Sequence, residues 1–436
     1  MEFLVGTAVD FELAAPEQPC HDESSPRFRL RVFDMSMPTQ IAPAWWHADE
    51  LGADDRGLLL DGHGIAELAA RHGTPLYVYS ANTIRRRFRE LRAALAETGA
   101  PFRIRYAMKA NRFRPVLDAV RREGDIGIDA SSPREVALAL DAGFAPHEIS
   151  ATSVMPSNRD LAAYAAAGIH VNLDTYSALS RWAVTPGRGD RAGLRIDPEV
   201  AAGYGEDARL AYGGGKFGFP SADVVPAAAF AAGLGLQVDE LHVHVGWGLQ
   251  DTAREALAGV YGRLAALAGM LPDVRVVNTG GGLCWRQQRD ERPLVPAMWS
   301  ALLKSHLAPL GCTIACEPGT YPLASAGLLV AEVNTVETRA GVTWIGLDAG
   351  QNVNVYAAHY AIPHEIIHVG QPLAPAVLRY NVAGNINEAA DVFARDVALP
   401  DVKEGDLLAF FLAGAYGSSM ASEHCLRPLA GEVMIE

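Results

Sequence analysis

The sequence has few cysteines, no excess of basic residues and no long apolar run, and each absence excludes a class of protein. Its 5 cysteines among 436 residues are an odd number without a Cys-x-x-Cys pair, which argues against a disulfide scaffold and favours a reducing, cytoplasmic location. The net charge of -14 offers no basic surface to a nucleic acid. No apolar run reaches the roughly 18 residues that a membrane span requires. We therefore expect a small-molecule substrate, with no nucleic-acid or membrane partner.

The first 43 residues lack the pattern of a signal peptide, because acidic residues are scattered through them and no compact apolar block follows a basic start. Such a stretch is typical of a disordered extension or of a start assigned too early. Met35 and Met37 lie closer to the first predicted strand.

From residue 74 onward, short apolar runs alternate with stretches of helical periodicity, which indicates βα units and a parallel sheet. The predicted helices include 82–97, 114–123, 133–142, 159–167 and 252–271. The predicted strands are 76–79, 103–108, 126–129, 148–151, 169–173, 193–196, 241–245 and 274–278. Eight parallel strands are what a closed (β/α)₈ barrel of the TIM type needs.

The pattern changes after residue 312, where apolar runs follow one another without long helices between them. This change predicts a second, mostly antiparallel β domain. Its predicted strands are 313–316, 327–336, 343–347, 377–382 and 407–412. The sequence thus divides into an extension (1–43), N-terminal strands that lead into the barrel or pack on the β domain (44–80), the barrel (81–312) and the β domain (313–436).

Catalytic residues of such barrels lie where the strands end, at the carboxyl face. Lys109 follows the second predicted strand, and burial there would lower its pKa and make the amine a nucleophile toward an aldehyde. A lone lysine in this place is more often an ordinary residue of the barrel rim.

Other strand ends carry polar motifs. Asp129 ends the third predicted strand, and His242 and His244 lie on one face at the end of the seventh. The glycines Gly280–Gly282 follow the eighth and allow backbone amides to approach a phosphate closely. Glu317 ends a further strand. Singly each motif is weak, since a glycine triplet is more often a turn and a strand-end carboxylate is often a helix cap.

Taken in order, these motifs resemble the fold type III pyridoxal-phosphate decarboxylases, the alanine racemase-like family of the diaminopimelate, ornithine and carboxynorspermidine decarboxylases. The resemblance extends from about residue 74 to about residue 430. The matching segments are 106–111, 129–135, 216–218, 242–246, 280–282, 317–319, 404–406 and 414–417.

The resemblance implies pyridoxal 5'-phosphate as cofactor and the decarboxylation of an amino acid as activity. Lys109 would hold the cofactor as a Schiff base and later assist proton transfer, while His244 would stack on its ring. Glu317 would keep the pyridine nitrogen protonated so that the ring accepts electrons, and Asp129 would help to set the charge of the lysine. The residues implied to hold the phosphate are Gly280, Gly281, Gly282 and Tyr416.

Two departures from the family pattern concern the substrate. Thr320 stands where the family usually has an arginine after Glu-Pro-Gly, so a bidentate contact to an anion is lost. Trp247 replaces a serine after the His-x-His-x-Gly motif. The stretch 348–359 also differs from the family form. We therefore predict a substrate other than diaminopimelate, such as an amino acid of specialised biosynthesis, either free or tethered to a carrier protein.

A further departure lies in the segment that, in this family, crosses a dimer interface into the active site of the partner. Asn387 stands where a cysteine is common, while Glu388 and Asp391 remain. An amide cannot donate a proton as a thiol can, so the reprotonating group is expected to differ. The resemblance implies a homodimer with shared sites, in which Asn387 and Glu388 are catalytic, Asn387 and Asp391 contact substrate, and Tyr416 also faces the other chain.

Three alternatives remain open at this point. His242 and His244 form a His-x-His pair that could bind zinc in a metal-dependent barrel hydrolase, although in such barrels we expect that pair on the first strand. A racemase would use the same cofactor to break the Cα–H bond. A non-catalytic carrier of the cofactor would resemble only the barrel, and the long second domain argues against it.

Overall fold

The structure is a computed structural model that describes residues 45–436 except 47, 49, 205–211 and 363. The prediction of a disordered extension over residues 1–43 therefore lies outside the described residues. Within the described ranges, none of the helices combines the length and the apolarity that crossing a bilayer demands.

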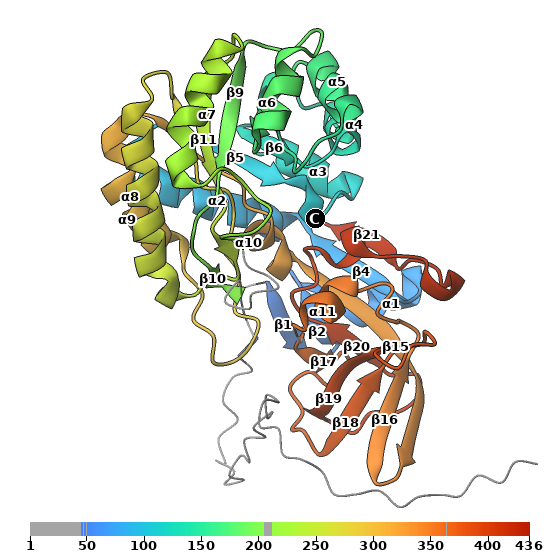
Figure 1. The fold of residues 1–436 in the computed structure, drawn as a ribbon. Coiled ribbons are helices and arrows are strands. Elements are labelled where there is room, and N and C mark those ends of the chain that lie inside the picture. Colours follow the sequence, from blue (N-terminus) through green and yellow to red (C-terminus); the bar gives the residue numbers. More distant parts are fainter. Residues whose placement is uncertain (1–44, 47, 49, 205–211, 363) are drawn as a thin grey trace, which may run out of the picture. The chain divides into compact units, whose positions relative to one another are not determined.

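Eight parallel strands of the described chain close into a barrel, which confirms the predicted fold (Figure 1). Around the barrel they follow one another in chain order, and β14 pairs with β5 to close the ring. The strands are β5 (Phe102–Ala107), β6 (Ile126–Ala130), β7 (Ile149–Thr152), β8 (His170–Leu173), β9 (Arg191–Ile196), β11 (Gln237–Val243), β13 (Val276–Asn278) and β14 (Thr313–Cys316).

Helices surround this barrel, one after each strand. They are α3 (Arg114–Arg121), α4 (Pro133–Asp141), α5 (Asn158–Ala167), α6 (Tyr176–Ala183), α7 (Ser221–Gly233), α8 (Arg254–Met270), α9 (Pro296–His306) and α10 (Thr320–Leu323). Because α10 is only one turn long, α2 (Ala81–Ala96) contacts both α9 and α3 and fills the last place in the ring.

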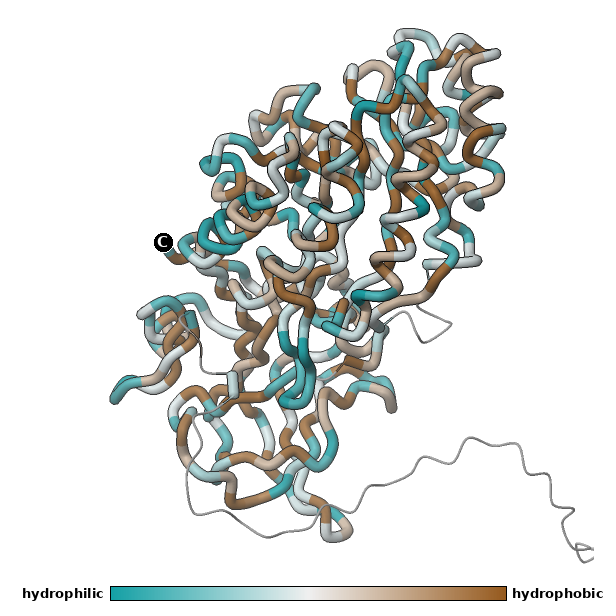
Figure 2. Tube along the Cα trace, turned by 90° about the vertical axis from the view of Figure 1, so that its left-hand side faces the viewer, coloured by the Kyte–Doolittle hydropathy of each residue, from teal (hydrophilic) through white to brown (hydrophobic). Residues whose placement is uncertain are grey.

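Local sequence explains these helices. The buried residues Ile84, Phe88, Leu91 and Leu95 of α2 recur at helical spacing and form one apolar stripe. Ser157 and Asp160 form a capping box at the start of α5, which ends at Gly168 in the left-handed conformation. Hydrophobic stretches run along the inner strands, whereas hydrophilic stretches mark outer turns and loops (Figure 2).

The second domain contains a mixed sheet in the order β17-β20-β15-β16-β18-β19, to which β4 and β21 add beside β15. Most neighbours are antiparallel, as predicted, but β16 pairs with β18 and β21 with β4 in parallel. The strands are β4 (Leu76–Ser80), β15 (Gly327–Arg339), β16 (Val342–Leu347), β17 (Ile366–His368), β18 (Leu378–Ala383), β19 (Val392–Leu399), β20 (Leu407–Phe410) and β21 (Gly431–Ile435).

Smaller elements complete the described fold. Three short strands form a separate sheet, and β10 pairs with β12 beside the barrel. These elements are β1 (Leu51–Asp54), β2 (Gly57–Leu60), β3 (His63–Gly64), β10 (Ala202–Gly203), β12 (Gly246–Trp247), α1 (Ile65–His72), α11 (Val355–Tyr360) and α12 (Gly417–Met420).

Two predicted strands differ from their expected places in the barrel and the β domain. The run 76–79, counted as the first of the eight barrel strands, is β4, which pairs with β15 and β21 in the β domain; of the two placements predicted for residues 44–80, packing on the β domain is the one observed for this strand. The run 313–316, predicted for the β domain, is the eighth barrel strand, so the boundary between residues 312 and 313 falls one strand too early. Short apolar runs look alike whichever sheet they join, and the one-turn α10 removed the signal of a helix after β14.

A glycine inside the barrel provides a test of this packing. Gly193 on β9 lies in register between Asn172 on β8 and Glu240 on β11, and a Cβ there would overlap the Asn172 side chain. We expect Gly193→Ala to lower the free energy of unfolding by about 1–3 kcal/mol, because overpacking forces buried side chains to move. Thermal denaturation measures the change.

The matched control is Gly269→Ala near the end of α8, where a Cβ meets no atom of the described structure within 4 Å. Alanine favours helices over glycine by about 1 kcal/mol, so stability should stay the same or rise slightly. Equal losses in the two variants would contradict the proposed packing.

Candidate active site

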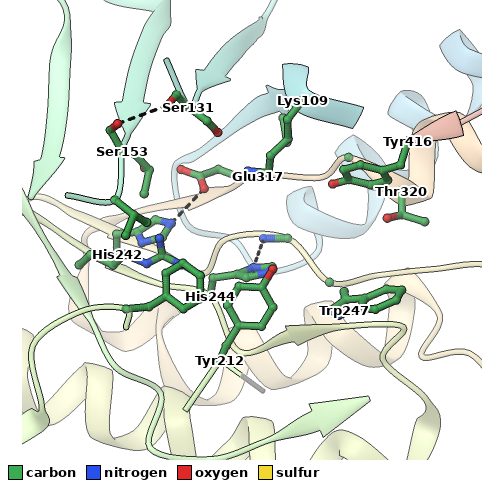
Figure 3. A pocket seen from close by; sticks show the side chains of 18 of the residues that line it. Lys109, Ser131, Ser153, Tyr212, His242, His244, Trp247, Glu317, Thr320 and Tyr416 are labelled. Atoms are coloured by element: carbon green, nitrogen blue, oxygen red, sulfur yellow. Dashed lines mark hydrogen bonds and ion pairs between the residues drawn. The ribbon is translucent and has the colours of Figure 1, made fainter. Parts of the chain in front are cut away.

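The barrel strands end around a cavity of about 410 Å³. Its walls come from strand ends, from the loops that follow them and from segments of the β domain (Figure 3). The lining residues are Ala107, Lys109, Ser131, Thr152, Ser153, Val154, Arg195, Tyr212, Phe217, His242, His244, Trp247, Gly281, Gly282, Glu317, Gly319, Thr320, Tyr356, Tyr360 and Tyr416. The structure therefore brings most of the predicted site residues together.

Lys109 lies in a short 3₁₀ turn, Met108–Ala110, directly after β5, which is the first barrel strand and not the second. Its Nζ donates to Asp129 Oδ2 at 3.1 Å, and its side chain is 47% exposed beside the fully buried Asp129. Desolvation lowers the pKa of Lys109, but the negative charges of Asp129 and Glu317 outweigh it and raise the pKa above the ordinary value. The predicted lowering is thus wrong, because nearby anions dominate over burial.

Glu317 directly follows β14 and is held by two hydrogen bonds. His242 Nε2 donates to Oε2 at 2.9 Å, and Asn278 Nδ2 donates to Oε1 at 2.7 Å. Burial by itself raises the pKa of Glu317, but His242, Lys109 and Arg105 lower it to a net value below the ordinary one. The carboxylate therefore stays ionised, and its two oxygens are fixed in place.

A second carboxylate lies beside it inside the barrel. Glu240 accepts from Arg105 at 2.7 and 3.0 Å, from Asn278 at 2.8 Å and from Asn172 at 3.3 Å. Burial raises the pKa of Glu240, but the Arg105 charge reverses the effect and lowers it. The amide of Asn278 thus joins Glu240 to Glu317, and the network crosses the barrel.

The glycine triplet packs tightly against this network. A Cβ at Gly280, Gly281 or Gly282 would lie within 2.7 Å of a backbone oxygen, so these positions exclude side chains. The N–H of Gly280 donates to Asn278 Oδ1 at 3.0 Å, and that of Gly281 to His244 Nδ1 at 3.2 Å. These two amides orient neighbouring side chains, while Gly281 and Gly282 also line the cavity.

His244 lines the cavity, and its ring lies edge-on to Tyr212 at a centroid distance of 4.5 Å. Burial, together with the charges of Arg195 and Lys109, lowers its pKa well below the ordinary value. The imidazole is therefore neutral, with Nδ1 as an acceptor. A flat, neutral ring in this position suits contact with a planar ligand.

Tyr416 lines the cavity of its own chain, which corrects the expectation that it faces the barrel of a partner. Its backbone N–H donates to Ala110 O at 2.7 Å, next to Lys109, and Asn111 Nδ2 donates to Gly414 O at 3.0 Å. These bonds hold the Tyr416 loop against the lysine turn. Burial raises the pKa of Tyr416 to about 12, so its hydroxyl remains a hydrogen-bond donor.

The predicted residues of the loop between β18 and β19 do not line this cavity. Asn387 and Glu388 are exposed, and Glu388 pairs with His424 at 3.0 Å. Asp391 is buried and accepts backbone N–H groups from Gln351 and Ile386. Within one chain, Asp391 organises the loop, and the loop lies outside the pocket.

Several lining residues were not predicted as site residues. Arg195 is 7% exposed and lies 4.4 Å above the ring of Phe217, and among the described residues its guanidinium has no carboxylate partner. Its position near the end of a predicted strand was a usable signal. Tyr356 and Tyr360 lie one turn apart on α11, but the sequence does not show that this helix reaches the barrel.

The pair considered for zinc has other partners. His242 Nε2 binds Glu317, and His244 Nδ1 accepts from Gly281. Both rings line the cavity, as strand alternation predicted. Their roles are thus accounted for by contacts within the network.

The buried pair of Arg105 and Glu240 should be essential for stability. Glu240→Ala leaves the Arg105 charge buried without a partner, which we expect to cost about 3–5 kcal/mol of unfolding free energy. The double variant Arg105→Met with Glu240→Leu should recover much of the loss in thermal denaturation. Arg89→Ala is the control: it removes an arginine that is 64% exposed and pairs with Glu123 at 2.9 Å. It should cost less than about 1 kcal/mol, because Glu123 keeps Arg92 as a partner. Similar losses for Glu240→Ala and Arg89→Ala would contradict this expectation.

Comparison with known proteins agrees with this arrangement. Residues 81–324, more than half of the chain, match the family model "Pyridoxal-dependent decarboxylase, pyridoxal binding domain". The diaminopimelate decarboxylase of Methanothermobacter thermautotrophicus is 34% identical over 399 residues, which cover 88% of this chain and 92% of that protein. That of Aquifex aeolicus is 30% identical, with 88% and 91% covered.

Solved structures show the same relationship. The diaminopimelate decarboxylase of Helicobacter pylori in complex with L-lysine superposes with a TM-score of 0.79 at 27% identity, over 85% of this chain and 94% of that one. The enzyme of M. jannaschii gives a TM-score of 0.80 at 27% identity, with 89% and 93% covered. The chain therefore belongs to the fold type III family of pyridoxal-phosphate-dependent amino-acid decarboxylases.

Proposed function

We propose that this enzyme decarboxylates an α-amino acid other than diaminopimelate. The family supplies pyridoxal-phosphate-dependent decarboxylation of the diaminopimelate decarboxylase type. The observation that carries the proposal is that the cavity keeps the residues expected to hold the cofactor but differs from the family where the substrate would lie. The cofactor residues are Lys109, Asp129 and Glu317. The residues that differ are Thr320 and Trp247, which line the cavity at positions where the sequence departs from the family pattern.

The residues present fit the cofactor. Asp129 Oδ1 and His242 Nδ1 are buried without a hydrogen-bond partner in the described part of the chain, and a Cβ at Gly319 would lie 3.0 Å from the Tyr416 hydroxyl. When bound, pyridoxal phosphate supplies an electron sink for the electron pair left as carbon dioxide departs.

We assign the protein groups as follows. Lys109 would hold the cofactor and would carry a proton at Nζ, with Asp129 keeping the free amine charged. The Glu317 carboxylate would be a hydrogen-bond acceptor for the cofactor, because its lowered pKa keeps it ionised. His244 would offer a flat, neutral surface to it. Gly281, Gly282 and Tyr416 border the space for the phosphate.

The first test concerns Lys109. Lys109→Ala should abolish both the visible absorbance of bound cofactor and carbon dioxide release from a panel of L- and D-amino acids, because no other described lysine lines the cavity. Lys304→Ala, on the exposed side of α9, should change neither readout. Exchange of the Cα hydrogen for deuterium without carbon dioxide release from any amino acid would favour a racemase and overturn the proposal.

We also propose that the enzyme is a homodimer with shared active sites. The contact between Glu388 and His424 places the Asn387 loop beside the segment 424–429. Leu426 in that segment is 92% exposed and Leu429 is 51% exposed. Apolar side chains exposed next to a loop that does not line the described cavity support a contact with a second copy.

Complementation tests the shared site. An Asn387→Ala/Glu388→Ala chain mixed and refolded with a Lys109→Ala chain should recover about a quarter of the wild-type activity, because half of the dimers carry one intact site. Mixing Glu317→Gln with Lys109→Ala should recover nothing, since both residues line the cavity of one chain. A monomer in light scattering, or the absence of recovery in the first mixture, would refute the shared site.

A cytoplasmic location remains part of the proposal. The described cysteines Cys284, Cys312, Cys316 and Cys425 are all free thiols. Free thiols are typical of reducing compartments.

A further inference from the structure

The cavity has two unlike halves. One half is lined by charged or polar groups at the ends of barrel strands, those of Lys109, Arg195, His242 and Glu317. The other half is formed by aromatic rings, which we call the aromatic wall: Trp247, Tyr356 and Tyr360. Figure 3 shows Trp247 across the cavity from Ser131 and Ser153.

We propose that the substrate is an α-amino acid with a bulky apolar side chain, which packs against the aromatic wall. The proposal rests on the proposed function and names its substrate class. It assigns Trp247, Tyr356 and Tyr360 as the residues that determine specificity.

The three rings form one continuous surface. The Trp247 ring lies 4.8 Å from Tyr360 and 6.0 Å from Tyr356, and the two tyrosines are 5.2 Å apart. Tyr356 and Tyr360 share a face of α11 because they are four residues apart. Trp247 and Tyr360 are partly exposed in the chain, which leaves ring surface for an apolar ligand to cover.

The wall is held from behind. The ring of Tyr204 contacts Trp247 at 5.0 Å, and its hydroxyl donates to Glu291 at 2.5 Å. The pairing of Gly203 with Trp247 fixes the backbone, and a Cβ at Gly248 would overlap the Tyr204 ring. The indole is therefore preorganised, which lowers the entropy cost of binding a ligand against it.

The wall also connects to the cofactor side. Tyr356 stacks on Tyr416 with ring centroids 5.5 Å apart and planes 15° apart. A substrate whose α-carbon lies near Lys109 would thus have its side chain next to the wall.

Charge argues for an apolar side chain. Glu317 is the only carboxylate among the described residues that line the cavity. Both of its oxygens already accept hydrogen bonds, from His242 and from Asn278. Burial raises the pKa of Tyr356 and Tyr360, so both hydroxyls are neutral. An ammonium group at the wall would be buried without a described carboxylate as partner, which is unfavourable. The unpaired cation that lines the cavity, Arg195, belongs to the strand-end half and not to the wall.

Carbon dioxide release by the holoenzyme tests the inference. The apolar probes are phenylalanine, tryptophan and leucine, and the charged probes are lysine and meso-diaminopimelate, with both enantiomers of each chiral acid. We expect kcat/KM to be at least about 10-fold higher for the best apolar probe than for either charged one. Trp247→Ala should lower kcat/KM for that probe by about 10- to 100-fold, mainly through KM.

Two further variants keep the result interpretable. Tyr360→Ala is a second test of the wall, for the case that Trp247→Ala does not fold. It should lower kcat/KM for the best apolar probe in the same way but by a smaller factor. Phe230→Ala on α7 removes a part-exposed ring that packs on Tyr176, outside the cavity, and should leave kcat/KM unchanged.

A preference for lysine over every apolar probe would overturn the inference while leaving the proposed function standing, because aromatic faces also attract cations. A preference for diaminopimelate over every other probe would overturn both the inference and the proposed choice of a substrate other than diaminopimelate. An equal loss for all probes in Trp247→Ala would overturn it as well, since the indole would then act on the cofactor. Binding of the cofactor with no carbon dioxide from any amino acid would overturn the proposed function itself.

Discussion

Two hydrogen bonds, from His242 and from Asn278, hold the Glu317 carboxylate inside the barrel. The same Asn278 side chain accepts the N–H of Gly280, and the next glycine donates to His244. Three strand ends, those of β11, β13 and β14, are thus tied together through one amide. Because the amide also bonds to Glu240, any displacement of Glu317 would disturb the floor of the barrel and the ring surface of His244 together.

The network explains how so many charges are tolerated in the interior. An isolated buried carboxylate would become protonated or destabilise the fold. Glu240 avoids this by facing Arg105, and Glu317 by facing His242. Asp129 has Lys109 as its charged hydrogen-bond partner. Burial and the nearby Glu317 charge raise the pKa of Asp129. The charge of the Lys109–Asp129 pair is therefore the one that a ligand in the cavity can change most easily.

Most of the fold could be predicted from the sequence, because hydrophobic periodicity reports buried strands and helices directly. The domain to which an individual strand belongs could not be predicted. Both β4 and β14 are short, buried runs, and hydrophobic periodicity does not indicate which strand such a run pairs with. The charged residues of the site were predictable as strand ends. Tyr356 and Tyr360 were not, because only the folded chain brings α11 to the barrel. The sequence also placed Tyr416 in a partner's site, whereas hydrogen bonds to Ala110 and Asn111 keep its loop in its own chain.

The position of β4 has a consequence for the order of folding during synthesis. β4 precedes the barrel in the chain, yet its neighbours β15 and β21 follow the barrel. On the ribosome, this strand emerges long before either neighbour exists, while each barrel strand finds its partner soon after it emerges, apart from the closing pair. The barrel can therefore assemble as an insertion within a β domain that is completed last. Since the Tyr416 loop belongs to that late domain, the active site would close only when the final strands dock.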